Sequence, residues 1–308
     1  MKSEIRIILE ILFCALILLF LISKIHIRET IEILRTVDLF WISIGLIVYL
    51  IALVITAYSL KALFDSIKHT PLMEWMRFYL VGFSMGLILP GRAGDLSIIY
   101  FAKQKGFDIG ASTALTITDK LITLIIFGII AALGIFSILH STELYWGLFF
   151  ALLCIIAGLF LFTPLARRWT IKVIGKYADK FQGFYKTFRN LLSYHKDKVF
   201  INIFITFLRP LGNALLIILI FKAMGIDVSF LYAILINAVT LIVSLVPLTP
   251  NGLGIREAVG TFLFSRVGVP LEATVAMYII ILMMNYTTGI IGTGVYLFHD
   301  GRQKSSKP

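Results

Sequence analysis

The sequence predicts an all-α, polytopic integral membrane protein with about six full spans and two re-entrant hairpins in an inverted repeat. The first observation is composition: of 308 residues, 59% are hydrophobic and 15% charged, and the mean hydropathy is +0.96. Such a chain has more apolar surface than a water-soluble core can bury. The second is a series of apolar runs near the length that crosses a bilayer, about 20 residues. The third is a pair of shorter apolar runs interrupted by Gly and Pro. Helices are expected because backbone amides in lipid must pair within their own segment.

The full spans are predicted from uninterrupted apolar runs. They are Ile5–Ile22, Phe40–Leu60, Leu121–Leu139, Leu144–Phe162, Val199–Phe221 and Ala273–Phe298. The charged start Met1–Arg6 resembles the beginning of a secretory signal, but no small-residue cleavage site follows the first run. We therefore expect the first helix to be retained, and the whole chain, 1–308, to form a single transmembrane domain.

Basic residues predict the orientation. The segment 165–198 is rich in Lys and Arg, with aromatic residues between them, which suits an amphipathic loop on the anionic cytoplasmic leaflet. The net charge of +11 therefore indicates inner loops and not a nucleic-acid partner. With this loop inside, the N-terminus and the tail 299–308 are also cytoplasmic, and we expect a plasma or inner membrane protein. Cys14 and Cys154 lie in apolar runs, so no disulfide is indicated.

Two broken runs predict the hairpins. In the half 61–139, Phe78–Leu89 is too short to span and is followed by the break Pro90–Asp95. Both flanks of this pair prefer the cytoplasm, so it enters from that side. In the half 199–298, the apolar runs 230–246 and 258–267 flank a second break, 247–257, and this pair is expected to enter from outside. Since the run 230–246 is almost long enough to span alone, eight ordinary spans are the alternative.

The breaks also predict a site, because paired Gly/Pro interruptions in two halves mark the substrate site of many secondary transporters. Each half-helix that starts after a break is expected to direct free amides toward anionic groups. The candidate substrate-binding residues are Arg92, Asp95, Arg209, Gly252, Gly254, Arg256 and Glu257. Secondary candidates are Pro90, Gly91, Gly94, Asp119, Lys120 and Asn251. The simpler alternative is that each Arg/acid pair only holds its break in shape. Arg209 has no acid nearby on its own helix, so its partner must come from another helix or from substrate.

Enzyme chemistry is not indicated. The sequence has no His-rich cluster, phosphate-binding glycine motif or nucleophile elbow, and its five histidines lie at loops or span ends. We therefore expect no catalytic residue, no metal and no cofactor. Buried asparagines at 202, 213, 237 and 285 are expected to make interhelical hydrogen bonds.

Both breaks resemble motifs of a known family. Pro90–Asp95 is similar to the P-x-R-x-G-[DE] motif of the lysylphosphatidylglycerol synthase transmembrane-region family, and Pro250–Glu257 resembles its P-x-G-x-G-x-x-E stretch. The similarity runs from the first helix to the last. Asn251 departs from it, standing where a small residue is common. Asp119 and Lys120 stand in place of an acid/arginine pair.

This resemblance implies a flippase-like module, as in the multiple peptide resistance factor, where such a region moves an aminoacylated phospholipid between leaflets. The soluble synthase domain of that protein is not in this sequence. Family members also occur beside glycosyltransferases of polyprenol-linked sugar pathways, so the expected substrate is an anionic lipid, aminoacylated or polyprenol-linked. The resemblance carries over the candidates Arg92, Asp95, Gly252, Gly254, Arg256 and Glu257. The alternative function is a non-catalytic membrane partner of a glycosyltransferase or lipid synthase, docked through the segment 165–198.

Overall fold

The computed structural model describes residues 14–17, 19–21, 23–88, 97–139, 182–245, 249 and 251–305. All regular elements in these ranges are helices, as predicted. They are α2 (Ile27–Arg35), α3 (Leu39–Phe64), α4 (Leu72–Ile88), α5 (Ser97–Gln104), α6 (Ile109–Leu139), α9 (Gln182–Tyr194), α10 (Lys196–Ala223), α11 (Phe230–Ser244), α12 (Ile255–Arg266) and α13 (Leu271–Ser305). The predicted span 144–162, most of 5–22, the first break and residues 165–181 of the basic segment lie outside the described residues.

Four of these helices are long and apolar enough to cross a membrane. They are α3, α6, α10 and the first part of α13, with spans of 26, 30, 28 and 24 residues. At about 1.5 Å per residue, even the shortest is about 36 Å long, which exceeds the roughly 30 Å of a hydrocarbon core. They coincide with four of the predicted spans. The chain is therefore a multi-pass helical membrane protein.

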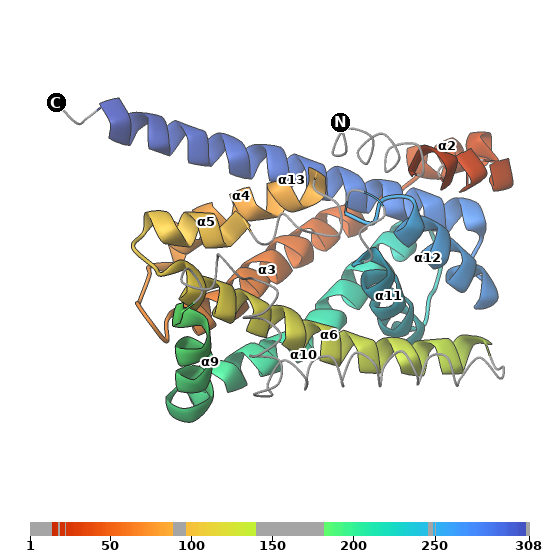
Figure 1. Cartoon of the computed structure of the whole chain (residues 1–308). Helices are drawn as coiled ribbons and strands as arrows, with labels where there is room; N and C mark the ends of the chain where they lie inside the picture. Colours follow the sequence, from red (N-terminus) through yellow and green to blue (C-terminus); the bar gives the residue numbers. More distant parts are fainter. Residues whose placement is uncertain are drawn as a thin grey trace.

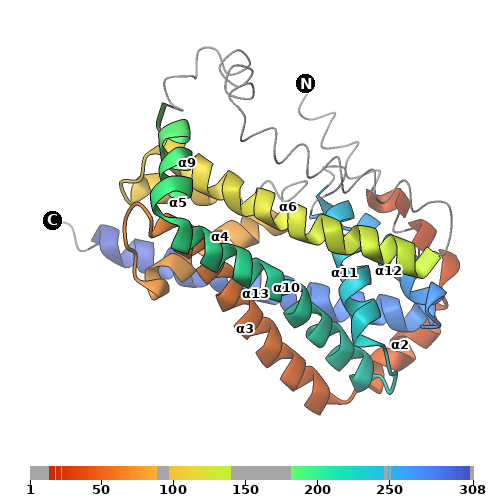
Figure 2. The same ribbon diagram turned by 90° about the horizontal axis from the view of Figure 1, so that it is seen from below.

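Helices α3 and α10 are antiparallel along their length. The amide of Asp38, the N-cap of α3, donates to the carbonyl of Ala223 at the end of α10 (2.8 Å). Near the other end of α3, Ser59 contacts Asn202 in the second turn of α10. Figures 1 and 2 show α9 at one end of this bundle and α2 at the other. We call these the α9 end and the α2 end.

The short helices form two pairs that open toward opposite ends. At the α9 end, Lys105 after α5 forms an ion pair with Glu74 in the first turn of α4, so α4 and α5 both have their outer ends there. At the α2 end, Phe264 near the end of α12 stacks edge-on with Phe221 of α10, with ring centroids 5.2 Å apart. Residues 224–229 form a short connection from the end of α10 to the start of α11. Helix α11 therefore also starts at the α2 end, and the pair α11/α12 opens there.

The inner ends of both pairs contact α13. A Cβ on Gly289 would lie 2.9 Å from Leu87 at the end of α4, and the Arg256 guanidinium in the first turn of α12 lies 5.6 Å from the Tyr278 ring centroid. Helices α11 and α12 have 15 and 12 residues, or about 22 and 18 Å, so neither spans about 30 Å alone. This geometry brings the second break beside the helices that flank the first.

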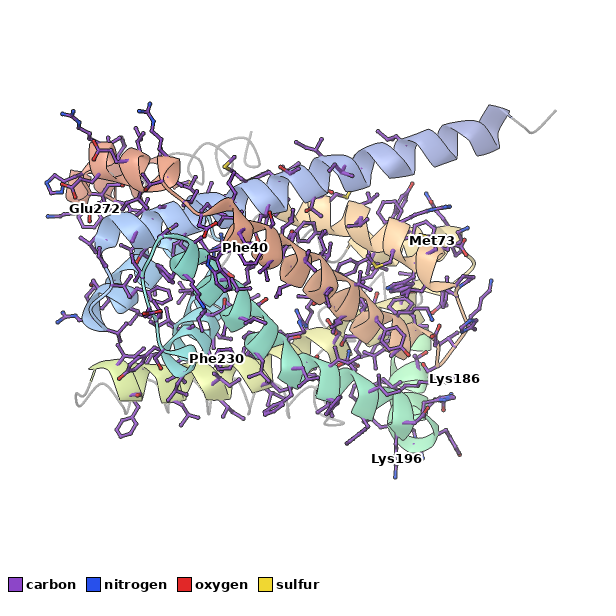
Figure 3. All side chains as sticks on the ribbon, turned by 180° about the vertical axis from the view of Figure 1, so that it is seen from behind. Phe40, Met73, Lys186, Lys196, Phe230 and Glu272 are labelled. Atoms are coloured by element: carbon purple, nitrogen blue, oxygen red, sulfur yellow. The ribbon has the colours of Figure 1, made fainter. Side chains whose placement is uncertain are left out.

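Side chains distinguish the two ends of the bundle. Figure 3 labels Met73, Lys186 and Lys196 at the α9 end and Glu272 at the α2 end. Residues 196–198, which the sequence analysis placed in the basic loop, belong to the first turn of α10. The cationic side chains of Lys196 and Lys198 therefore stand at the outer end of a spanning helix.

Candidate functional site

A cavity of about 170 Å³ lies between the long helices and both short pairs. Its charged and amide residues are Asp119, Lys120, Arg209, Asn213, Asn251, Arg256 and Asn285. The other walls come mainly from α3 and from α4, where Gly82 and Gly86 leave room. Helices from both halves of the sequence thus meet at one polar chamber near the middle of the bundle.

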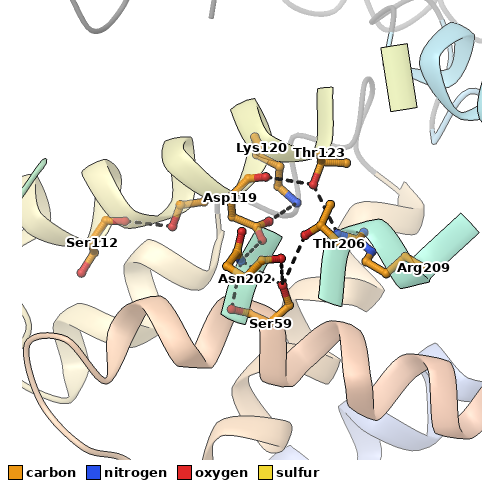
Figure 4. Close-up of polar contacts among 9 residues, drawn as sticks. Ser59, Ser112, Asp119, Lys120, Thr123, Asn202, Thr206 and Arg209 are labelled. Atoms are coloured by element: carbon orange, nitrogen blue, oxygen red, sulfur yellow. Dashed lines mark hydrogen bonds and ion pairs between the residues drawn. The ribbon is translucent and has the colours of Figure 1, made fainter. Parts of the chain in front are cut away.

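The most buried polar group at the cavity is the carboxylate of Asp119 on α6, whose side chain is 5% exposed. Its Oδ1 accepts a hydrogen bond from Asn202 Nδ2 (2.9 Å), which also donates to the carbonyl (3.0 Å) and hydroxyl (2.8 Å) of Ser59. Its Oδ2 lies 3.7 Å from Lys120 Nζ. Figure 4 shows this network joining α3, α6 and α10. The predicted pair Asp119/Lys120 is therefore one ion pair inside a larger polar cluster.

Arg209 on α10 completes this side of the cavity. Its NH1 donates to Thr123 Oγ1 (3.2 Å), and the Thr123 hydroxyl donates to the backbone carbonyl of Asp119 (2.8 Å). Pro210 follows inside the helix, and a proline has no amide to donate to the carbonyl one turn earlier. The partner on another helix that the sequence predicted for Arg209 is thus the hydroxyl of Thr123. Since this hydroxyl is neutral, the hydrogen bond does not neutralise the charge of the Arg209 guanidinium.

The second break is a left-handed turn, a conformation that glycine adopts freely and asparagine tolerates. Asn251, Gly252 and Gly254 have φ of 49°, 71° and 86°, a region that side chains with a Cβ rarely adopt. A Cβ on Gly252 would lie 2.5 Å from Ser244 Cβ and 2.6 Å from Ser244 Cα. The glycine therefore lets the turn fold back onto the end of α11 and start α12 beside the cavity.

Glu257 holds both the helix start and Arg256. Its Oε2 accepts from the Gly254 amide (2.6 Å), and its Oε1 accepts from Arg256 Nε (3.0 Å) and NH2 (2.7 Å). The expectation of a free helix N-terminus at this break is wrong for Gly254, because the helix's own carboxylate occupies it, as in the acidic half of a capping box. The predicted Arg256/Glu257 pair does form, so an anion reaching this turn meets a guanidinium that already has a partner.

The structure thus brings some predicted residues together and leaves others unplaced. Arg209, Arg256, Asn251, Asp119 and Lys120 line the same cavity, and Gly252, Gly254 and Glu257 shape its edge. The first-break candidates, Pro90, Gly91, Arg92, Gly94 and Asp95, lie outside the described residues. Their flanking helices α4 and α5 both contribute to the cavity wall.

Sequence reasoning missed several lining residues. Tyr49 and Tyr79 line the cavity, and the Tyr49 hydroxyl donates to Asn285 Oδ1 (3.0 Å). Asn202 makes the interhelical bonds expected of it, whereas Asn213 and Asn285 also face the cavity. An aromatic hydroxyl midway along an apolar span was the available signal, since buried Tyr usually needs a hydrogen-bond partner.

A possible metal-binding cluster lies at the α2 end, away from the cavity. The ligand atoms of His26, Glu29 and Glu272 all lie within 4.8 Å of one another. Glu272 Oε1 already accepts from both the amide and the Nδ1 of His26, each at 3.2 Å. This arrangement serves to tie the start of α2 to the start of α13.

Together, the fold and the cavity define a class: a multi-pass helical membrane protein with a cation-lined chamber between two short helix pairs. The chain matches the family described as lysylphosphatidylglycerol synthase TM region over residues 7–292, and it belongs to that family. The family that the motifs at the two breaks indicated is thereby confirmed. A comparison with curated proteins returned no match.

Proposed function

We propose that this protein carries an anionic lipid or lipid-linked sugar between the two leaflets of its membrane. The observation behind the proposal is that Lys120, Arg209 and Arg256 line one cavity at mid-bundle. Cationic side chains at membrane depth are costly, and they usually serve a substrate or ion path. A phosphate or phosphodiester headgroup is the group whose charge and geometry such cations bind.

Arg209 is the principal headgroup contact. Of the two cavity arginines, Arg256 is bound twice by the Glu257 carboxylate, whereas Arg209 donates to the neutral Thr123 hydroxyl. A guanidinium keeps its charge at any physiological pH and can hold two phosphate oxygens at once. The headgroup thus lies between α6 and α10, with Lys120 beside it.

The two short pairs provide access. We propose that α4/α5 enters the membrane from the α9 end and α11/α12 from the α2 end, as inverted halves, and that opening alternates between them. The cationic side chains of Lys105, Lys186 and Lys196 at the α9 end favour a cytoplasmic location for that end. Both termini are then cytoplasmic, in a plasma or inner membrane, and the acyl or prenyl chains of the substrate stay in lipid while its headgroup crosses.

Leaflet exchange in vesicles tests the proposal. Purified protein is reconstituted with a fluorescent phosphatidylglycerol, and in parallel with a fluorescent polyprenyl phosphate, and outer-leaflet label is quenched with dithionite. Loss of a charged hydrogen bond worth about 1.5–3 kcal/mol predicts a rate about ten- to a hundredfold lower in Arg209→Gln. Arg35→Gln is the matched control, because Arg35 is exposed at the end of α2. Wild-type protein that moves neither lipid, or equal rates in Arg209→Gln and wild type, would refute carriage.

A membrane partner of a lipid-modifying transferase is the second candidate. The feature that favours it is the surface of α9, where Lys186 and Arg189 are exposed and the Tyr194 side chain is 80% exposed. Copurification of a transferase that is lost in Lys186→Glu/Arg189→Glu, with no leaflet exchange by the purified chain, would favour this candidate over carriage.

A further inference from the structure

We propose that Ser59, Asp119 and Asn202 form a binding site for one Na⁺ ion beside the cavity. The three residues come from α3, α6 and α10, and their side chains lie together in Figure 4. Ser59 and Asn202 are 0% exposed and Asp119 is 3% exposed, so their polar atoms need partners within the protein. The existence of this site does not depend on lipid carriage.

The side-chain amide of Asn202 does not match the atoms around it. Its Nδ2 contacts three oxygen acceptors: the Ser59 carbonyl (3.0 Å), the Ser59 hydroxyl (2.8 Å) and Asp119 Oδ1 (2.9 Å). An amide nitrogen has only two hydrogens to donate. Its Oδ1 is buried and has no hydrogen-bond partner among the residues that the structure describes. The nitrogen therefore has one acceptor too many, and the oxygen has no donor.

Rotation of this amide by half a turn brings four oxygens together. The oxygen and nitrogen of the amide exchange places when it rotates, so Asn202 Oδ1 then lies beside the two Ser59 oxygens and Asp119 Oδ1. Four acceptors at one point repel one another unless a cation lies among them. A water molecule supplies only two donors, whereas all four oxygens can hold the same ion.

The size and charge of the site fit Na⁺. An ion of about this size takes oxygens at about 2.4 Å, as Ca²⁺ does, so that neighbouring ligand oxygens lie about 3.4 Å apart. The oxygens that are now 2.8–3.0 Å from Nδ2 need to move outward by only about half an ångström. The Thr206 hydroxyl, which is 0% exposed and 3.5 Å from the Ser59 hydroxyl, offers a fifth ligand. A single carboxylate suits a monovalent ion, whereas Ca²⁺ sites commonly use several.

The nearby cationic side chains approach other atoms than Asp119 Oδ1. Lys120 Nζ lies 3.7 Å from the second carboxylate oxygen, Oδ2. Lys61, two residues after Ser59 on α3, forms an ion pair with Asp65. Since Asp119 also lines the cavity, an ion on Oδ1 neutralises a negative charge in the chamber that the proposed headgroup enters.

Binding of radiolabelled Na⁺ to the full chain in detergent tests the site without requiring transport. The purified protein is held on scintillation beads in choline chloride, and the bound label is displaced with unlabelled NaCl or KCl. We expect saturable binding to a single site, with K⁺ at least about tenfold weaker as a competitor because the cavity size selects between the two ions. Na⁺ at about ten times its Kd should also raise the thermal unfolding midpoint by about 2–4 °C, since only the folded chain binds it.

Matched variants assign the ion to these residues. Asp119→Asn removes the charge and is expected to lose saturable Na⁺ binding, whereas Asp227→Asn, in an exposed loop, binds as wild type does. Ser59→Ala removes one ligand oxygen and is expected to weaken Na⁺ binding about tenfold, which preserves the test if Asp119→Asn does not fold. Ser43→Ala is its control, because this exposed hydroxyl on the same helix donates to the Leu39 carbonyl.

Three results would overturn the proposal: no saturable Na⁺ binding by wild type, displacement by K⁺ as effective as by Na⁺, or wild-type Na⁺ affinity in Ser59→Ala. Na⁺ binding that depends on Ser59 and Asp119 in a protein that moves no lipid would support this site and refute carriage alone.

Discussion

Replacing Gly252 by alanine tests how the second break is built. The residue has φ of 71°, and an added Cβ would lie 2.5 Å from Ser244 Cβ and 2.6 Å from Ser244 Cα. The left-handed conformation costs an alanine about 1–2 kcal/mol. The overlap adds about 1–3 kcal/mol, because its nearest atoms are backbone and Cβ atoms, which cannot rotate away. We therefore expect Gly252→Ala to lower the free energy of unfolding by about 2–5 kcal/mol.

Gly225 offers a matched control for this change. Its φ is 73°, and nothing lies within 4 Å of an added Cβ, so Gly225→Ala carries only the conformational cost of about 1–2 kcal/mol. Both variants are unfolded by increasing SDS in mixed micelles, and their midpoints and slopes are compared with wild type. Equal destabilisation by the two variants would show that the turn does not pack against α11 as described.

Two further changes test the helix contacts around the cavity. A Cβ on Gly292 of α13 would lie 2.8 Å from Leu80 Cβ on α4, whereas one on Gly294 would meet nothing within 4 Å. The free energy of unfolding of Gly292→Ala should therefore be about 1–3 kcal/mol lower than that of Gly294→Ala in the same micelle assay. Equal stability of the two variants would contradict the close approach of α4 to α13. Glu257→Gln leaves the largely buried Arg256 guanidinium, 11% exposed, without its carboxylate, and it is expected to cost about 3–5 kcal/mol. The cost is measured as the shift in thermal unfolding in detergent, and a shift no larger than that of the exposed Glu32→Gln would refute the role of this pair.

Much of the fold was predictable because it depends on local composition. The spans α3, α6, α10 and α13 follow from apolar runs longer than the hydrocarbon core is thick. The Arg256/Glu257 pair was also predictable, since the two residues are adjacent. The hydrogen bond from the Gly254 amide to Glu257 could have been predicted but was not. An acidic residue three positions after the N-cap commonly accepts a hydrogen bond from the N-cap amide.

The site was only partly predictable. The motifs marked the second break, and the charges marked Arg209 and Asp119 as unusual for apolar spans. Their partners, Thr123 and Asn202, lie on other helices, 86 and 83 residues away in sequence. Nothing local determines which face of α6 turns toward α10. The predicted hairpin entry from opposite faces of the membrane, the site roles and the residues of the first break stay predictions.

The sequence by itself determined that this chain lives in lipid as a helical bundle, which apolar runs interrupted by Gly and Pro it contains, and which ionisable residues are placed at membrane depth. These properties follow from the cost of exposing apolar surface to water and unpaired amides to lipid, and both costs are set residue by residue. Only the tertiary structure decided that Lys120, Arg209 and Arg256 share one cavity and that Asn202 holds Asp119. Those contacts depend on the rotation and depth of each helix against its neighbours, which the packing of the whole bundle sets.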